Sequence, residues 1–338
     1  MRIKFGLNYQ VMLGILLVLL IVGFGLIEPV FFYPDVLFDV TAIVGEIGIM
    51  ALAMTFIITT GGIDLSVGYI LQLSAIVFGA VFTATGNLAL AVILALLTGT
   101  ASGFFNGLII SKTKIPPLVT TLATMNLYRG LSMIIAGTNS YSGFPAVFKK
   151  FSTIMIFGVV PIQFIYFLVF FFLFNLFYAR GSLGRNLRGI GFNENALIFS
   201  GIKTKRIKLF IYTLGGLMCA FAALVYLGRL SSAKTSMGND LNLQVITAVV
   251  LGGTSTMGGV GSIVGTFIGV LIIGVLKKGF TLLNFSGNIF NFTLGVMLIV
   301  ALIAFSILER RNLLAGKLKG RMSVGGHPSS ESDGKTVS

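Results

Sequence analysis

The side chains that most often carry out enzyme chemistry are nearly absent from this sequence. Its 338 residues include one cysteine, Cys219, in an apolar run, and one histidine, His327, in a polar tail. Nucleophilic triads and metal centres need several such side chains close together. We therefore expect no catalytic residue, no metal and no cofactor, and a membrane-embedded enzyme is the weakest interpretation.

One short segment invites comparison with a phosphate-binding loop, namely Gly334-Lys335-Thr336. A P-loop also needs a glycine at the position that Ser329 occupies, and it follows a β-strand, which this segment does not. We therefore expect that any energy from ATP hydrolysis reaches this chain from another subunit.

Three ionisable residues interrupt or border stretches that are otherwise apolar: Glu46, Asp64 and Arg129. At the middle of a bilayer such a group costs at least about 2.5–3.5 kcal/mol, so it usually faces a bundle interior or a cavity. We expect Asp64 to accept hydrogen bonds from the first amides of the helix that follows it. Arg129 can pair with Glu46 or with backbone carbonyls, and a pathway role and a role in fastening helices both remain open.

Two glycine pairs break apolar runs at matching places, in TGGIDLSVG at 60–68 and in LGGTSTMGG at 251–259. Glycine-interrupted spans in corresponding halves of a chain are typical of transport folds with broken helices beside the pathway. Close helix packing through small residues is the alternative. The candidate pathway or helix-break residues are Gly61, Gly62, Asp64, Ser66, Arg129, Gly252, Gly253, Thr254 and Ser255.

A third segment, GFNENALIFSGI at 191–202, lies in a long basic loop. Asn193 suits a helix N-cap, Glu194 suits the positive end of the helix dipole, and Gly201 suits the C-terminal cap. Two helical turns are not stable alone in water. We therefore expect a partner protein to cover Leu197 and its apolar neighbours, unless the helix lies along the membrane surface. The candidate docking residues are Gly191, Asn193, Glu194, Ala196, Leu197, Phe199, Ser200 and Gly201.

The composition shows where these segments lie. Apolar residues make up 56% of the chain, charged residues only 10%, and the mean hydropathy is +1.00. Soluble proteins carry about a quarter charged residues. The chain is therefore predicted to be an all-α, polytopic membrane protein. Its net charge of +14 is better explained by Lys and Arg retained on cytoplasmic loops than by nucleic-acid binding.

Uncharged stretches of about 20 residues, the length of one crossing, predict about ten transmembrane helices, two of them broken at the glycine pairs. The predicted spans are 10–27, 41–60, 67–84, 88–110, 117–136, 159–178, 209–228, 242–257, 261–276 and 287–307. With both termini in the cytoplasm, 17 of the 24 Lys and Arg residues lie inside, six lie outside, and Arg129 lies within a span. This asymmetry supports the orientation, although Lys277 and Lys278 are among the six outside.

Residues 1–310 are expected to form one transmembrane domain that includes the basic loop at 179–208. Cleavage of the first span as a signal peptide is disfavoured, because its apolar run is long and no small-x-small site precedes Glu28. Residues 311–338 are expected to form a cytoplasmic tail that is largely disordered at its Ser- and Gly-rich end.

With these motifs together, residues 10–310 resemble the membrane-spanning permease subunits of sugar ATP-binding-cassette importers, the ribose, xylose and autoinducer-2 group. The resemblance rests on GGIDLSVG at 61–68, on 121–130, on 191–202 and on VITAVVLGGTS at 245–255. It implies ten helices, two permeases around one pathway, two ATP-binding-cassette ATPase subunits and an extracytoplasmic sugar-binding protein. The second permease is another copy or a paralogue. It also implies that 191–202 is the coupling helix that docks on the ATPase, with Phe192 where the family has a small residue.

The resemblance predicts a transport subunit of the bacterial cytoplasmic (inner) membrane, not an enzyme, that passes a monosaccharide or a related sugar-like ligand. The alternative is an ion-coupled secondary transporter that uses Asp64, Glu46 and Arg129. The long basic loop with its docking helix favours the first interpretation.

Overall fold

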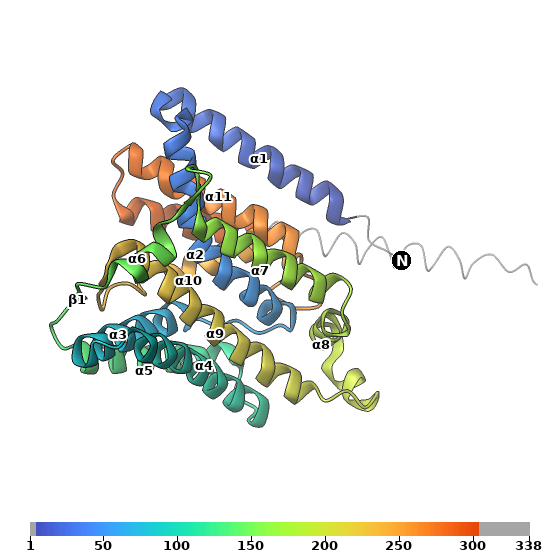
Figure 1. The fold of residues 1–338 in the computed structure, drawn as a ribbon. Helices are drawn as coiled ribbons and strands as arrows, with labels where there is room; N and C mark the ends of the chain where they lie inside the picture. The colour runs from blue at the N-terminus through green and yellow to red at the C-terminus, as the bar shows by residue number, and fades with distance from the viewer. Residues whose placement is uncertain (1–4, 304–338) are drawn as a thin grey trace, which may run out of the picture.

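The computed structural model describes residues 5–303, and this part of the chain is almost entirely α-helical, as predicted (Figure 1). The tail predicted at 311–338 lies outside the described residues. The long helices are α1 (Phe5–Ile27), α2 (Pro34–Thr59), α3 (Val67–Thr85), α4 (Leu88–Lys112), α5 (Pro117–Ala136), α7 (Ile162–Ala179), α9 (Thr204–Leu230) and α11 (Ile263–Leu282). The remaining helices are η1 (Pro29–Phe32), α6 (Ala146–Thr153), α8 (Ser182–Phe199), which is kinked at Asn193, α10 (Leu241–Leu251) and an apolar helix at Gly287–Ile303.

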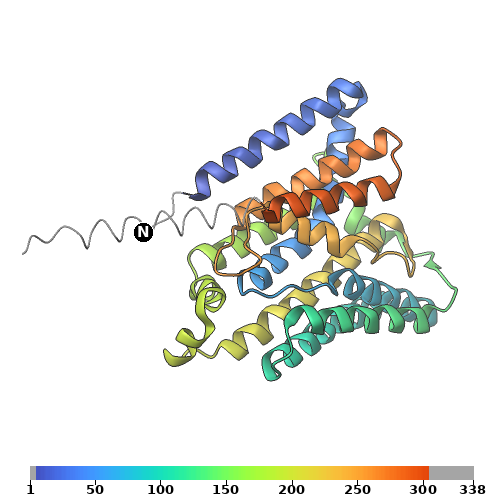
Figure 2. The ribbon, with the colours of Figure 1, turned by 180° about the vertical axis from the view of Figure 1, so that it is seen from behind.

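Seven helices are long and apolar enough to cross a membrane: α1, α2, α3, α4, α7, α9 and α11. α10 and Gly287–Ile303 are apolar but shorter, and the second of these lies beside α11 in Figure 2. A polytopic membrane protein is therefore confirmed. The total of ten crossings and the cytoplasmic position of both termini stay predictions.

The helix predicted at 242–257 is shorter than expected. α10 ends at Leu251, because Gly252 and Gly253 follow it and Gly253 turns the chain with a φ of +88°. By contrast, α2 is longer than predicted. It begins at Pro34 rather than at 41, since proline fits the first turn of a helix.

α2 is the central helix of the bundle, and 83% of its most apolar window is buried. It packs against α7, α9, α10 and α11. By contrast, only 11% of the corresponding window is buried in α1 and 22% in α7. A helix that is apolar all round and buried on one side only presents its other side to lipid, so α1 and α7 form part of the outer wall.

The described part of the chain also contains two pairs of two-residue strands. β1 (Tyr141–Ser142) pairs antiparallel with β4 (Ser232–Ala233), and β2 (Met155–Ile156) pairs antiparallel with β3 (Val160–Pro161). The first pair links the segment after α5 to the segment after α9. The second pair is a hairpin between α6 and α7.

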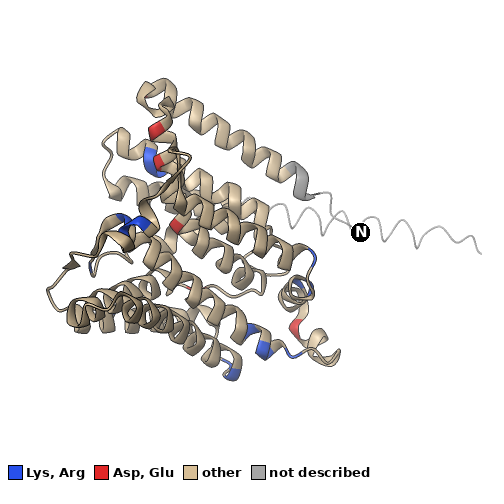
Figure 3. Cartoon of the chain, in the orientation of Figure 1, with Lys and Arg blue, Asp and Glu red and all other residues tan. Residues whose placement is uncertain are grey.

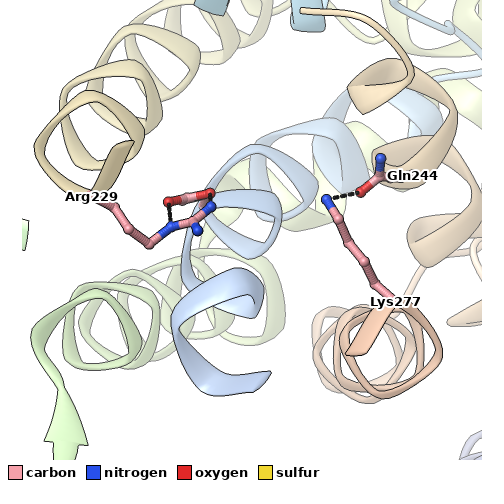
Figure 4. Close-up of polar contacts among 4 residues, drawn as sticks. Arg229, Gln244 and Lys277 are labelled. Carbon is pink, nitrogen blue, oxygen red and sulfur yellow. Dashed lines mark hydrogen bonds and ion pairs between the residues drawn. The ribbon is translucent and has the colours of Figure 1, made fainter. Parts of the chain in front are cut away.

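Charged residues gather at the two ends of the bundle and leave the helices between them largely uncharged (Figure 3). Two acidic residues in the described part of the chain are buried, Glu46 in α2, which is 4% exposed, and Asp64 after α2, which is 2% exposed. Glu46 is part of an ion pair. Its carboxylate accepts hydrogen bonds of 2.7 and 2.9 Å from the guanidinium of Arg229 at the end of α9 (Figure 4). Glu46 therefore pairs with Arg229 and not with Arg129, because the rotation of α2 and α9 about their axes brings these two side chains together.

α4 and α9 approach so closely that only glycine fits between them. A methyl group on Gly103 would overlap the carbonyl oxygen of Tyr212 and lie 2.8 Å from Cα of Gly216. Gly216 in turn leaves no room for a side chain against Gly99. This contact is a small-residue interface of the kind that packs membrane helices without a hydrophobic driving force.

We predict that Gly103→Ala lowers stability by about 1–3 kcal/mol, because the added methyl group forces α4 and α9 apart. Gly130→Ala is the matched control, since nothing lies within 4 Å of a methyl group there and alanine favours a helix by about 0.5–1 kcal/mol over glycine. Thermal unfolding of both variants in the same detergent measures the difference. Equal midpoints would show that the α4–α9 contact is looser than described.

Candidate functional site

The first glycine break begins with a glycine-capped helix end. α2 ends at Thr59, the amide of Gly61 donates to the carbonyl of Ile58 at 2.9 Å, and the amide of Gly62 donates to that of Ile57 at 3.3 Å. Gly61 has a φ of +79°. This pair of bonds is the Schellman pattern, in which a left-handed residue satisfies the last free carbonyls of the helix.

The second break has the same pattern. The amide of Gly253 donates to Val250 at 2.9 Å, and the amide of Thr254 donates to Val249 at 3.3 Å. Gly253 is therefore the structural counterpart of Gly61, whereas the sequence comparison matched Gly252 to Gly61. The structural repeat is therefore offset by one residue from the sequence repeat. The equivalent residues are defined by their left-handed backbone conformation and not by their place in the glycine pair.

Asp64 lies in the extended segment between α2 and α3 and is 2% exposed. Its Oδ1 accepts hydrogen bonds from the amide of Ser66 at 2.8 Å and from the hydroxyl of Ser66 at 2.6 Å. Asn106 of α4 donates to Ser66 Oγ at 2.8 Å and lies 3.4 Å from Asp64 Oδ2. Tyr128 of α5 donates to Asn106 Oδ1 at 3.0 Å. The carboxylate thus belongs to a polar network that connects the start of α3 with α4 and α5.

The backbone beside Asp64 is also held by side chains. Thr121 of α5 donates to the carbonyl of Ile63 at 3.0 Å and accepts from the amide of Leu65 at 3.2 Å. Asn242 of α10 lies 3.4 Å from the carbonyl of Leu65. A buried backbone group without a partner is costly, so these bonds are what permits non-helical backbone in this buried segment.

The two breaks meet each other and the segment at 191–202. The amide of Gly259 donates to the carbonyl of Thr59 at 2.8 Å, which joins the second break to the end of α2. Gly191 lies against both of these groups, and a methyl group on it would overlap the Gly259 nitrogen and the Thr59 oxygen. We call the contact of Thr59, Gly191 and Gly259 the glycine junction. It connects α8 to both broken helices through backbone atoms.

The segment after the glycine junction forms a short helix at 194–199 with the predicted caps. Asn193 has a non-helical conformation, with φ of −162°, and its side chain accepts from the amide of Ala196 at 3.1 Å. Gly201 has a φ of +80°, and the amide of Ile202 donates to Leu197 at 3.0 Å. Glu194 pairs with Lys208 of α9.

The helical residues after Asn193 begin where the sequence predicts, because Asn193 is non-helical and its side chain caps them. Two details differ from the sequence interpretation. A further helical segment, from Ser182 to the bend at Asn193, precedes them. Leu197 is only partly exposed, since it packs on Gly189 in the part of α8 before the bend. Phe199 is the projecting apolar side chain, with 91% of its surface exposed.

The remaining candidates divide between the core and the surface. Ser66, Thr254 and Ser255 are buried at the breaks. Arg129 is exposed on α5, 5.9 Å from the centre of the Tyr69 ring, and it contacts neither Glu46 nor the Asp64 network. Among the residues that the sequence interpretation missed are Asn106, Arg229 and Gly259 as contact residues. Their partners are far away in the sequence, so only the polarity of Asn106 and Arg229 within apolar runs signalled them.

The comparisons with known proteins agree on one family. Residues 36–302 match the family described as branched-chain amino acid transport system / permease component. The ribose import permease protein RbsC of Bacillus subtilis (strain 168) is 38% identical over 86% of this chain and 90% of its own length. The autoinducer 2 import system permease protein LsrD of Escherichia coli (strain K12) is 36% identical over 91% of this chain and 94% of its own. No solved structure matches the chain.

We predict that Asp64→Ala damages the protein more than Asp64→Asn. The amide oxygen of asparagine can still accept from Ser66, whereas alanine leaves that buried amide unpaired at a cost of about 1–3 kcal/mol. Membrane abundance and thermal unfolding in detergent measure the two losses. Equal losses would point instead to a requirement for the negative charge.

Proposed function

This chain belongs to the family of permease components of branched-chain amino acid transport systems, and we propose that the molecule it passes is a monosaccharide or a related sugar-like ligand. It is the membrane-spanning, non-catalytic subunit of an ATP-driven importer in the bacterial cytoplasmic membrane, and ATP is hydrolysed on a partner subunit. The sugar class is supported by the two relatives, whose names specify ribose and autoinducer 2 and whose similarity covers most of this chain.

The coupling segment at 191–202 is proposed to receive the ATPase. Phe199 projects from it with 91% of its surface exposed, beside the exposed Ile198 and Ser200. Apolar side chains that fill a pocket of the partner carry most of the energy of an interface. The Glu194–Lys208 ion pair attaches the segment to α9. A displacement of Phe199 is therefore transmitted to the helix and not lost in a flexible loop.

The glycine junction supports a route from this segment to both broken helices. Gly191 lies two residues before the bend of α8 at Asn193, and its backbone contacts the end of α2 and the loop before α11. Packed backbone that leaves no space for a methyl group transmits displacement, because interiors of this density do not compress. In the proposed mechanism, ATPase movement shifts 191–202 and thereby reorients the breaks at Gly61 and Gly253.

The pathway itself is proposed to run along α5, between this chain and a second permease copy or a paralogue. Asn126 and Arg129 lie three residues apart on α5, within reach of one face, and both are exposed. Polar side chains at this depth avoid lipid and face water or protein. Ten crossings, cytoplasmic termini and an extracytoplasmic sugar-binding protein complete the proposed assembly.

The geometry disfavours the ion-coupled alternative, because the residues that would carry a proton or an ion are engaged in other contacts. Glu46 is held by two hydrogen bonds from Arg229 and cannot exchange an ion without breaking them. Asp64 accepts two hydrogen bonds from Ser66, and Arg129 contacts neither the Glu46 nor the Asp64 carboxylate. Uptake of labelled ribose into vesicles separates the two mechanisms: orthovanadate stops an ATP-driven importer, whereas an ionophore stops an ion-coupled one.

We predict that Phe199→Asp abolishes uptake without lowering the amount of permease in the membrane. If the ring fills a pocket of the ATPase, its replacement costs at least about 2 kcal/mol of docking energy. Co-purification of the tagged permease with its ATPase, read as ATP hydrolysis per permease, measures this loss. Val147→Asp is the control, since it makes the same kind of change at an exposed residue at the opposite end of the molecule. Unchanged ATPase recovery with Phe199→Asp would mean that the docking surface lies elsewhere.

A further inference from the structure

The hairpin between α6 and α7 exposes more apolar surface than a loop in water normally does. Its tip is Phe157, which is 96% exposed, and Ile154, Met155 and Val159 beside it are also exposed. Phe157 has a φ of 54°, a conformation that costs least for glycine or asparagine and is uncommon for a large side chain. Nothing in the described part of the chain covers this ring, so its contacts must come from the surroundings.

The depth of the hairpin follows from the length of α7. α7 has 18 residues and so measures about 27 Å, at about 1.5 Å per residue. The hydrocarbon core of a bilayer is about 30 Å thick. Arg180 follows the last residue of α7 directly, which fixes that end at the membrane surface. The residues just before Ile162 therefore lie at the opposite boundary of the hydrocarbon core and not beyond it.

Two hydrogen bonds hold the hairpin at this depth. The amide of Ile162 donates to the carbonyl of Ile154 at 3.0 Å, and the hydroxyl of Tyr166 donates to the carbonyl of Phe151 at 2.9 Å. Both join the α6–hairpin segment to the first turns of α7. β3 also packs against α2, so the hairpin cannot swing away from the helix that it precedes.

The position of the hairpin favours lipid over a protein partner. The segment between α6 and α7 does not reach the left end of the bundle in Figure 1, where β1 lies. A protein that approached the pathway from that end would meet β1 and α6 first. The hairpin continues instead from α7, which has 22% of its most apolar window buried and turns the rest toward lipid.

We propose that residues 154–159 form an interfacial anchor, in which Phe157 and Met155 insert between the lipids of the extracytoplasmic leaflet at the level where acyl chains meet headgroups. Apolar side chains at this boundary gain burial, while the backbone groups at the open edges of the two-stranded hairpin can still reach water at the level of the headgroups. The inference rests on α7 crossing the membrane and not on which molecule is transported. Its consequence is that the outer end of α7 is fixed while its inner end leads directly into α8.

The sequence contains no tryptophan, so a single introduced tryptophan reports its own surroundings. Phe157→Trp is reconstituted in lipid nanodiscs that contain phospholipids brominated either near the headgroup end of the acyl chain or near its terminal methyl. Phe172→Trp, 65% exposed on α7, is the control for lipid contact, and Phe199→Trp, 91% exposed on the coupling segment, is the control for water. Met155→Trp, at a residue that is 50% exposed, is a second probe in case the turn at 157 does not tolerate the indole.

The anchor predicts that Phe157→Trp is quenched as strongly as Phe172→Trp, and more by bromine near the headgroup than by bromine near the terminal methyl. Iodide in the buffer should quench it less than it quenches Phe199→Trp. If the tryptophans at 157 and 155 both escape the brominated lipids and respond to iodide like Phe199→Trp, the hairpin lies in water. It would then be available to an extracytoplasmic protein, and the proposal would be wrong.

Discussion

Backbone groups that a helix break buries away from water must find partners within the protein, and most features of this structure follow from this constraint. Both breaks use a left-handed glycine, at Gly61 and at Gly253, to close the helix that ends there. The extended backbone after Gly61 then depends on Asp64 and Thr121. The carbonyl of Thr59 accepts a hydrogen bond from the amide of Gly259, so each break supplies a partner for a backbone group of the other. The two breaks are therefore one structural unit, although they lie far apart in the sequence.

Different sets of contacts hold the two ends of the bundle. At the end opposite α8, ion pairs and hydrogen bonds between long side chains join α2, α9, α10 and α11, namely Glu46–Arg229, Asp39–Lys278 and Gln244–Lys277. At the end that bears α8, backbone contacts of Gly191 join α8 to the end of α2 and to the loop before α11, and the Glu194–Lys208 ion pair joins α8 to α9. Removing one partner of a buried ion pair costs about 3–5 kcal/mol, so the first set keeps the end opposite α8 together.

Local signals in the sequence predicted local structure well. The turn-forming and capping residues Asn193, Gly201 and Gly61 act where the sequence suggested, because their roles depend only on nearby backbone. The charge and hydropathy of the chain were likewise enough to predict a polytopic helical protein. Contacts between distant segments were not predictable, since hydropathy does not fix the rotation of one helix against another. For that reason the sequence suggests Arg129 as a partner of Glu46 and does not indicate that Gly191 contacts both breaks.

The central claim is that movement of α8 reaches both breaks through the glycine junction, and transport by Gly191→Ala tests it most directly. The added methyl group has no space between the Gly259 nitrogen and the Thr59 oxygen, so it separates the junction while leaving Phe199 free to dock. In proteoliposomes that contain the permease with its ATPase and binding protein, the amount of the binding protein's ligand taken up per ATP hydrolysed is measured against the wild type. The account predicts that ATP hydrolysis continues while uptake per ATP falls sharply. An unchanged ratio, with the variant inserted and bound to its ATPase, would contradict it.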